Sequence, residues 1–230
     1  MAAAEGMGGL PFSDPRVPPG PQAGVHVTIR LRLRCDVYKA GVRKAIKTYH
    51  VLNEVVLDRG SNPWLCNIEC RESGRAFATV QADGLLLATP TGSTAYSLAA
   101  GGSMVHPSVP AILFTPICPH SLASRPVILP DSARLELVVP ETARAGVWAS
   151  FDGRERHELQ RGDKIVVRMS DYPMPTVNRM DHSHDWFESL EKCLSWNERV
   201  SQRPVPALTP TALFTTASAM HNAHSGEALD

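Results

Sequence analysis

The sequence predicts a mainly β protein made of packed antiparallel sheets, similar to a β-sandwich, with one short helix at a ligand site and one amphipathic helix near the C-terminus. Two observations support this fold class. Short apolar and β-branched runs recur along the chain, and Gly, Asp or Pro residues separate most of them. Only two segments have helical spacing, so the strand-helix-strand alternation that builds a parallel sheet is not indicated.

The first predicted strands lie in the amino-terminal half. Val25–Arg34 alternates apolar and polar residues as a half-buried strand does, with its arginines on one solvated or interface face. Tyr49–Leu57 is a second apolar run, ended by a turn at residues 58–60. Phe77–Gln81 and Leu85–Thr89 flank Ala82-Asp83-Gly84, which predicts a hairpin.

The later strands follow the same pattern, with turn residues between them. They are expected at Ala111–Ile117, Arg134–Val139, Val147–Phe151 and Lys164–Met169. Turns are expected at Asp152-Gly153 and Arg161-Gly162-Asp163, where glycine can adopt positive φ.

Two segments predict helices. A short helix is expected from about Thr94 to Ala100, ended by Gly101-Gly102. A second helix is expected to begin at Asp185, with Glu188 three residues later as in a capping box. Apolar residues fall on one side of this second helix at Trp186, Phe187, Leu190, Cys193 and Leu194, so we expect it to pack on the core and to carry no chemistry.

Composition and charge narrow the classes of protein that fit. The chain has 230 residues, of which 43% are hydrophobic, so it can form a sizeable core. Its 23 Lys and Arg balance its 23 Asp and Glu, whereas nucleic-acid and membrane-surface binders need a concentrated positive field. We therefore expect no nucleic-acid partner and no membrane partner. The five scattered cysteines indicate free thiols in a reducing, cytoplasmic compartment.

The two ends of the chain differ in composition from its middle. Residues 1–24 are rich in Pro, Gly and Ala, and residues 201–230 have a similar character. Such segments bury too little apolar surface to offset the entropy lost on ordering. We expect a flexible leader over 1–24, a folded domain over 25–200 and a flexible tail over 201–230. We find no secretory signal and no apolar run long enough to span a bilayer.

The segment from Asp83 to Gly102 predicts a strand, a tight turn at residues 90–92 and a helix that starts at Ser93-Thr94. A helix start exposes unpaired amides and a partial positive charge, so it favours polar or anionic ligand groups. Gly92 would let a ligand approach the backbone, and Tyr96 could pack on a flat ring. The alternative is an ordinary capped helix with Tyr96 in the core.

Asn53 and Glu54 interrupt an apolar run. Neighbours on a strand point to opposite faces, so one of the two could be buried and would then need partners. An amide beside a carboxylate suits the vicinal hydroxyls of a ribose. The alternative is a bulge or a strand end.

Two other groups of residues have suggestive chemistry. The segment Asp181-His-Ser-His-Asp185 holds metal-ligand types, but it has no further ligands at a suitable spacing. Cys118 and His120 are flanked by prolines, and no third group orients them for nucleophilic catalysis. We expect no metal site in this chain and no thiol nucleophile.

Several motifs in order resemble the NAD kinase family. They are Leu52-Asn-Glu-Val-Val56, then Asp83-Gly84, then Thr89-Pro-Thr-Gly-Ser-Thr-Ala-Tyr96, with support from Met104–Pro107, Thr115–Leu122, Arg125-Pro126 and Ser150–Gly153. The closing Asp185–Leu190 is similar to the terminal helix of the animal, cytosolic enzymes. The resemblance covers about residues 25–200, which it identifies as the carboxy-terminal, β-rich domain of such a kinase.

The resemblance implies an activity. Family members use ATP and a divalent metal, expected to be Mg²⁺, to phosphorylate the 2′-hydroxyl of the adenosine ribose of NAD, which gives NADP. They assemble as dimers or tetramers, so a homo-oligomer or pairing with full-length subunits is expected here.

The resemblance also implies roles for seven residues. Asn53 and Glu54 would hold ribose hydroxyls. Asp83 would reach NAD, in some members across a subunit interface. A nucleotide pocket would be lined by Thr94, Ala95 and Tyr96. Asp152 would lie in a loop near the nucleotide, although a hairpin turn explains it equally well.

The Gly-Gly-Asp-Gly-Thr motif of the family does not occur in these 230 residues. In the family this motif belongs to the amino-terminal domain, holds phosphates and supplies the expected base. Without it, phosphoryl transfer should be nearly abolished, so the catalytic residues stay unknown. We expect a truncated NAD kinase that supplies the NAD-binding half. The alternatives are a catalytically silent NAD(P)-binding or subunit-pairing module, and a β-rich interaction domain that has lost the ligand.

Overall fold

The computed structural model describes residues 24–196. The tail expected over 201–230 lies outside the described residues, as does the leader expected over 1–24 except for Gly24. The chain divides into one compact unit that ends at Ser189 and a second that begins at Leu190. Within the described part, none of the helices is long and apolar enough to cross a membrane.

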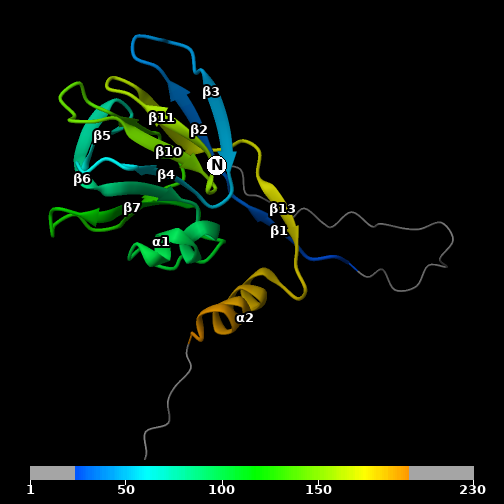
Figure 1. Cartoon of the computed structure of the whole chain (residues 1–230). Helices are drawn as coiled ribbons and strands as arrows, with labels where there is room; N and C mark the ends of the chain where they lie inside the picture. Colours follow the sequence, from blue (N-terminus) through cyan, green and yellow to red (C-terminus); the bar gives the residue numbers. More distant parts are fainter. Residues whose placement is uncertain (1–23, 197–230) are drawn as a thin grey trace, which may run out of the picture. The chain divides into compact units, whose positions relative to one another are not determined.

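The first unit is mainly antiparallel β-sheet, as predicted (Figure 1). A small sheet pairs β1 (Val27–Arg30) with β13 (Met174–Val177). A large sheet has the order β11-β10-β4-β6-β5-β9-β12-β2-β3, and β7 branches from β6 and carries β8. The strands of the large sheet are β2 (Leu33–Tyr38), β3 (Lys47–Val51), β4 (Glu54–Asp58), β5 (Cys66–Glu72), β6 (Arg75–Ala88), β7 (Ala111–Pro119), β8 (Val127–Pro130), β9 (Leu135–Val138), β10 (Val147–Phe151), β11 (Arg154–Leu159) and β12 (Lys164–Met169).

The longest strand, β6, corrects the predicted hairpin at Ala82-Asp83-Gly84. The strand continues through these residues: it pairs with β5 up to Ala82, with β7 from Ala82 on and with β4 from Gly84 on. Gly84 is needed for close packing and not for a turn, because an added Cβ would lie 2.6 Å from the carbonyl oxygen of Leu57.

Two other predicted strands are each divided in two. The predicted Val25–Arg34 strand breaks after Arg30, because β1 pairs with β13 while β2 pairs with β12 and β3. The predicted Tyr49–Leu57 strand breaks at residues 52–53, where the chain leaves β2 and joins β6 and β10. In both places the apolar alternation continues while the partner strands change.

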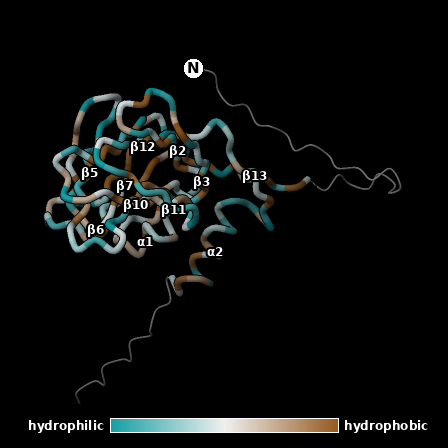
Figure 2. Tube along the Cα trace, turned by 45° about the horizontal axis from the view of Figure 1, so that its top comes forward, coloured by the Kyte–Doolittle hydropathy of each residue, from teal (hydrophilic) through white to brown (hydrophobic). Residues whose placement is uncertain are grey.

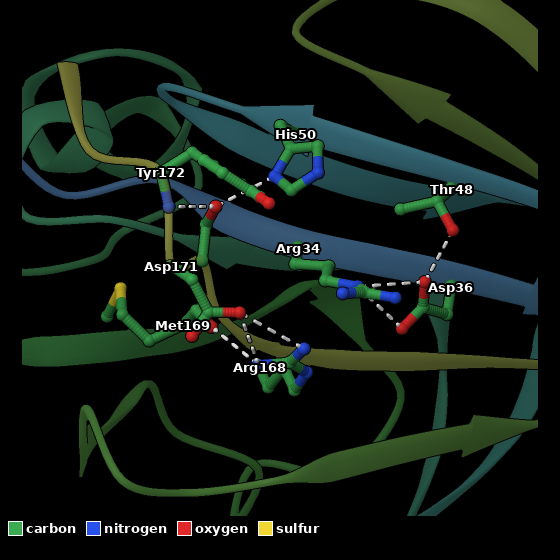
Figure 3. Close-up of polar contacts among 9 residues, drawn as sticks. Arg34, Asp36, Thr48, His50, Arg168, Met169, Asp171 and Tyr172 are labelled. Atoms are coloured by element: carbon green, nitrogen blue, oxygen red, sulfur yellow. Dashed lines mark hydrogen bonds and ion pairs between the residues drawn. The ribbon is translucent and has the colours of Figure 1, made fainter.

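The arginines at positions 30, 32 and 34 do not lie on one strand, and each makes a different contact. Arg30 bonds to Thr176, and Arg32 bonds to the carbonyl of Tyr172. Arg34 lies 3.0 Å from both carboxylate oxygens of Asp36, as Figure 3 shows. All three side chains are held by local contacts.

Strands β4 and β7 and the last part of β6 are buried on both faces. The main core includes alternate side chains of β4 and β6, namely Val55, Leu57, Leu85 and Leu87. The alternate residues join a smaller cluster on the other face, formed by Val56, Leu86, Ala88, Val105, Leu113 and Ile117. In Figure 2 the hydrophobic segments gather within the strands. Each fully buried leucine contributes about 2 kcal/mol, so the strand ends here are firmly anchored.

Both helical segments begin at earlier residues than predicted. The expected helix at 94–100 is a 3₁₀ turn (Thr91–Thr94) followed by α1 (Tyr96–Ala99), and it ends at Gly101 with φ of 85°. The helix expected from Asp185 is α2 (His182–Leu194). The carboxylate of Asp181 caps it by accepting the amides of residues 183 and 184, so the predicted capping box at Asp185 is wrong.

Candidate functional site

The two motifs that the sequence singled out meet where two strand ends lie side by side. Glu54, at the start of β4, pairs with Ala88, at the end of β6. The next residue, Thr89, donates its amide to the carbonyl of Asn53 at 2.9 Å and its hydroxyl to the carbonyl of Leu52 at 2.6 Å. The fold therefore places residues 52–54 against the segment that leads into α1.

Asp152 holds this junction from the tight turn between β10 and β11. Its carboxylate accepts the backbone amides of Leu52, Asn53 and Glu54 at 2.7, 2.8 and 3.1 Å. Asp152 has φ of 49° and Gly153 has φ of 68°, so the predicted turn is confirmed. The carboxylate thus positions the Asn53-Glu54 backbone. Its expected place near a nucleotide stays a prediction.

Glu54 is buried beside that turn, with 9% of its surface exposed. Its Oε2 atom is buried and has no hydrogen-bond partner among the described residues. Burial raises the pKa of this carboxyl, and the negative charge of Asp152 raises it further. An unsatisfied buried acceptor costs about 1–3 kcal/mol, so a ligand that donates a hydrogen bond here would relieve a cost already present in the fold.

Gly92 is buried, and its lack of a side chain makes room for a neighbouring backbone segment, while the predicted close approach of a ligand stays a prediction. A Cβ at this position would lie 2.4 Å from the carbonyl oxygen of Asn53, so the Asn53 backbone occupies that space. The amides of Gly92, Ser93 and Ala95 all donate within the turn, to Thr89, Pro90 and Gly92 respectively. The predicted anion site at the helix start is therefore not formed by these amides.

The three residues that follow the turn lie toward the surface. Thr94 is half-buried, whereas Ala95 and Tyr96 are exposed. Tyr96 keeps 45% of its surface exposed, so the alternative that placed it in the core is wrong. Partial burial raises the pKa of its phenol, and the charges of Asp58 and Asp83 add to that effect. A flat, exposed ring here can pack on a ligand.

Asp83 lies in the middle of β6 and does not contact Asn53 or Glu54. Its carboxylate is 2.9 Å from Nε of Arg59, and its side chain is 37% exposed. Its carbonyl accepts the amide of Arg59 and the thiol of Cys66. The side chain is therefore held in place and remains accessible.

A pocket of about 170 Å³ adjoins Thr91 and Thr94. Arg30, Asn178 and Trp186 also line it, together with other residues of β1, β13 and α2. The sequence did not predict this wall, because its residues come from segments far apart in the chain that only the fold brings together.

The carboxylates of the Asp181–Asp185 segment bind backbone amides. Asp181 caps α2, and Asp185 accepts the amides of Arg179 and Met180. Between residues 24 and 196, no group of three or more His, Cys, Asp or Glu side chains is arranged to hold a metal ion.

Comparison with protein families identifies one match. Residues 52–179 match the family described as the ATP-NAD kinase C-terminal domain. The match begins just before Asn53 and includes all seven residues for which the sequence predicted a binding role.

Curated relatives match a similar span. NAD kinase 2, chloroplastic, of Arabidopsis thaliana is 60% identical over 180 residues, which cover 78% of this chain and 18% of that protein. The NAD(+) kinase of Saccharomyces cerevisiae is 45% identical over 192 residues, which cover 78% of this chain and 36% of that protein. The chain thus spans well under half the length of these relatives. They come from a plant and a yeast, so the predicted animal type stays a prediction.

Two solved structures share the fold. Yeast NADH kinase, solved in complex with NADH, superposes with a TM-score of 0.70 at 38% identity, covering 77% of this chain and 51% of that chain. An NAD kinase from Archaeoglobus fulgidus, in complex with ATP, has a TM-score of 0.59 at 19% identity, covering 72% and 61%. The second likeness concerns the fold alone.

Proposed function

This chain belongs to the ATP-NAD kinase C-terminal domain family, and from that premise we propose that it holds NAD for phosphorylation of the 2′-hydroxyl of the adenosine ribose. In this proposal the chain is the NAD-binding half of an enzyme that uses ATP and yields NADP. The domain limits that we propose are residues 25–200.

The observation that carries this proposal is the buried Oε2 of Glu54, which has no hydrogen-bond partner within residues 24–196. Hydroxyl groups of a ribose are donors, and a carboxylate accepts from them in charge-assisted bonds that contribute about 1.5–3 kcal/mol. The side-chain amide of the adjacent Asn53 can bind a second hydroxyl. Asp152 fixes the backbone of both residues, so the pair is held in position before the ligand arrives.

The remaining predicted residues fit around such a ligand. Tyr96 would pack on the adenine ring, with Thr94 and Ala95 beside it. Asp83 would reach the dinucleotide from β6, where Arg59 holds its carboxylate. Asp152 would hold the backbone of residues 52–54 from a loop near the nucleotide.

The phosphoryl-transfer chemistry is proposed to need groups outside this domain. A ribose hydroxyl is a poor nucleophile at neutral pH, and transfer depends on positioning and on charge stabilisation of the phosphoryl oxygens. A base, the ATP phosphates and a Mg²⁺ ion would supply these in the complete enzyme. The described residues do not gather a metal-binding group themselves, so their proposed task is to bind and orient NAD.

The first experiment is a titration of NAD into the purified chain by calorimetry, with ATP-dependent formation of NADP assayed on the same sample. Asn53→Ala combined with Glu54→Ala should abolish NAD binding, and Glu72→Ala, an exposed carboxylate at the end of β5, should leave it unchanged. Unchanged binding in the double variant would remove the ribose assignment. NAD binding without NADP formation would favour the second candidate function, a silent NAD(P)-binding module.

We also propose that the chain self-associates or pairs with full-length subunits. Among the described strands β8 pairs only with β7, and its Val127 and Ile128 side chains are 48% and 53% exposed. An open apolar strand edge is a template for association. Light scattering at high concentration should show an oligomer, and Ile128→Lys should shift it toward monomer. A monomeric wild-type chain would refute self-association.

The proposed compartment is the cytoplasm. All five cysteines are free thiols, as a reducing compartment favours. Microscopy of a fluorescent fusion would test this, and exclusive accumulation in an organelle would contradict it.

A further inference from the structure

A second pocket, of about 360 Å³, is lined by none of the seven residues discussed above. The loop after β4 contributes Trp64 and Leu65, and β5 contributes Asn67. The loop between β9 and β10 contributes Arg144, and Gln81 and His120 are also part of the wall. Its volume is at the lower end of the range of about 300–1,000 Å³ for small-molecule sites.

Arg144 gives this pocket a positive charge. Its guanidinium carbon lies 4.8 Å from the centre of the Trp64 ring, and its carbonyl accepts a hydrogen bond from Arg161 at 2.9 Å. None of the ion pairs between residues 24 and 196 includes Arg144. A guanidinium carries a positive charge and offers several N–H donors, so Arg144 can bind an anionic group.

Asn67 supplies a hydrogen-bond acceptor, whereas Arg144 supplies donors. Its Oδ1 atom is buried and has no partner among the described residues. Asn67 lies directly across from Gln81 in the pairing of β5 with β6. A buried acceptor without a donor is unfavourable, so the pocket matches a ligand that carries an N–H group as well as a negative charge.

The loop that carries Trp64 is fixed in place. Nη1 of Arg59 donates to the carbonyls of Asn62 and Pro63 at 3.1 and 3.4 Å, while its Nε pairs with Asp83. Trp64 and Leu65 are nevertheless 50% and 40% exposed. They present an ordered apolar surface on which a flat ring can lie.

We propose that this pocket is a separate binding site for a nucleoside monophosphate. Arg144 binds the phosphate, Asn67 Oδ1 accepts an N–H group of the base, and the base lies against Trp64 and Leu65. The proposal does not depend on NAD binding at Asn53 and Glu54.

Calorimetric titration of the 230-residue chain with AMP and with inorganic phosphate tests the proposal. AMP should bind more tightly than phosphate, and Arg144→Gln should weaken AMP about tenfold, as expected for one charge-assisted hydrogen bond. The matched control is Arg156→Gln, because Arg156 also lies over a tryptophan, Trp148 at 5.3 Å, but outside the pocket. This control should bind AMP as the wild type does.

Two further variants separate this pocket from the site at Asn53 and Glu54. AMP binding should persist in the Asn53→Ala, Glu54→Ala variant and should weaken in Asn67→Leu, which keeps the side chain's size but removes its acceptor. Circular dichroism confirms that each variant is folded. The proposal is overturned if AMP does not bind, if phosphate binds equally well, if Arg144→Gln and Arg156→Gln have the same affinity, or if the double variant loses AMP. NAD titration of the same samples reports on the proposed function independently.

Discussion

Replacing Asp152 by Asn should destabilise the domain and loosen the Asn53-Glu54 segment. Asn has nearly the same size and tolerates positive φ, so the turn at φ of 49° can persist. The oxygen that accepts the amides of Asn53 and Glu54 can remain, but an NH₂ group would then face the amide of Leu52, now 2.7 Å from a carboxylate oxygen. Two donors would oppose each other, and the charge that strengthens all three bonds would be gone.

The size of the effect follows from these contacts. A hydrogen bond to a charged group contributes about 1.5–3 kcal/mol, and a buried donor left unpaired costs about 1–3 kcal/mol. Because the turn can partly relax, we expect a loss of about 2–4 kcal/mol in the free energy of unfolding, measured by urea denaturation. The affinity for NAD should fall as well, since Asn53 and Glu54 would no longer be held.

The matched control is Asp171→Asn. The side chain of Asp171 is 68% exposed, and its oxygen lies 3.4 Å from Arg168 (Figure 3). An exposed ion pair contributes about 0–1 kcal/mol, so this variant should stay close to the wild type. The reasoning is refuted if Asp152→Asn and Asp171→Asn differ by less than about 0.5 kcal/mol. A second readout is the pKa of Glu54, which should fall in Asp152→Asn because a neighbouring negative charge is removed.

Three further predictions concern the same site. Gly92→Ala should cost several kcal/mol in thermal or urea unfolding, because its Cβ would lie 2.4 Å from the Asn53 carbonyl, whereas Gly153→Ala, with nothing within 4 Å and φ of 68°, should cost about 1 kcal/mol. The pKa of Glu54 is raised above its ordinary 4.5 in the fold, so its stabilising contribution is complete below pH 4.5 and is lost as pH rises through the folded pKa. Glu54→Gln should therefore raise the melting temperature at pH 7, and the difference should vanish in acid. Tyr96→Ala should weaken NAD binding by calorimetry with little change in melting temperature, because Tyr96 is 45% exposed.

The predicted strand bounds are most accurate where a strand ends at turn-forming residues. Val147–Phe151 and Lys164–Met169 match β10 and β12 residue for residue. The prediction failed at β6, because Ala82-Asp83-Gly84 has the composition of a turn, while the structure uses Gly84 to let β6 approach β4. A glycine needed for close packing cannot be told from a glycine needed for a turn by local composition alone.

The candidate site was predictable only in part, for a related reason. The residue types at Asn53 and Glu54 indicated a ribose site, yet their contact with Thr89 depends on the pairing of β4 with β6. The Asp-Gly turn was evident, whereas the direction of the Asp152 carboxylate required the fold. The pocket between Asn67 and Arg144 could not be predicted from the sequence, because it forms where β5, β6 and separate loops converge.

The short segment of residues 52–54 can serve both folding and binding. Asp152 holds its backbone, and Glu54 offers a carboxylate to a ligand. Asp152 receives three amide hydrogen bonds and stabilises the junction, while the Oε2 atom of Glu54 receives none from the part of the chain that the structure describes. The charge that secures the backbone also raises the pKa of its neighbour, so the same interaction that builds the site makes an ionised Glu54 less favourable without a ligand. Folding alone would favour an apolar or neutral residue at position 54. A ligand that donates a hydrogen bond to Glu54 removes this desolvation penalty. The carboxylate at position 54 is therefore better explained as a binding group than as part of the core.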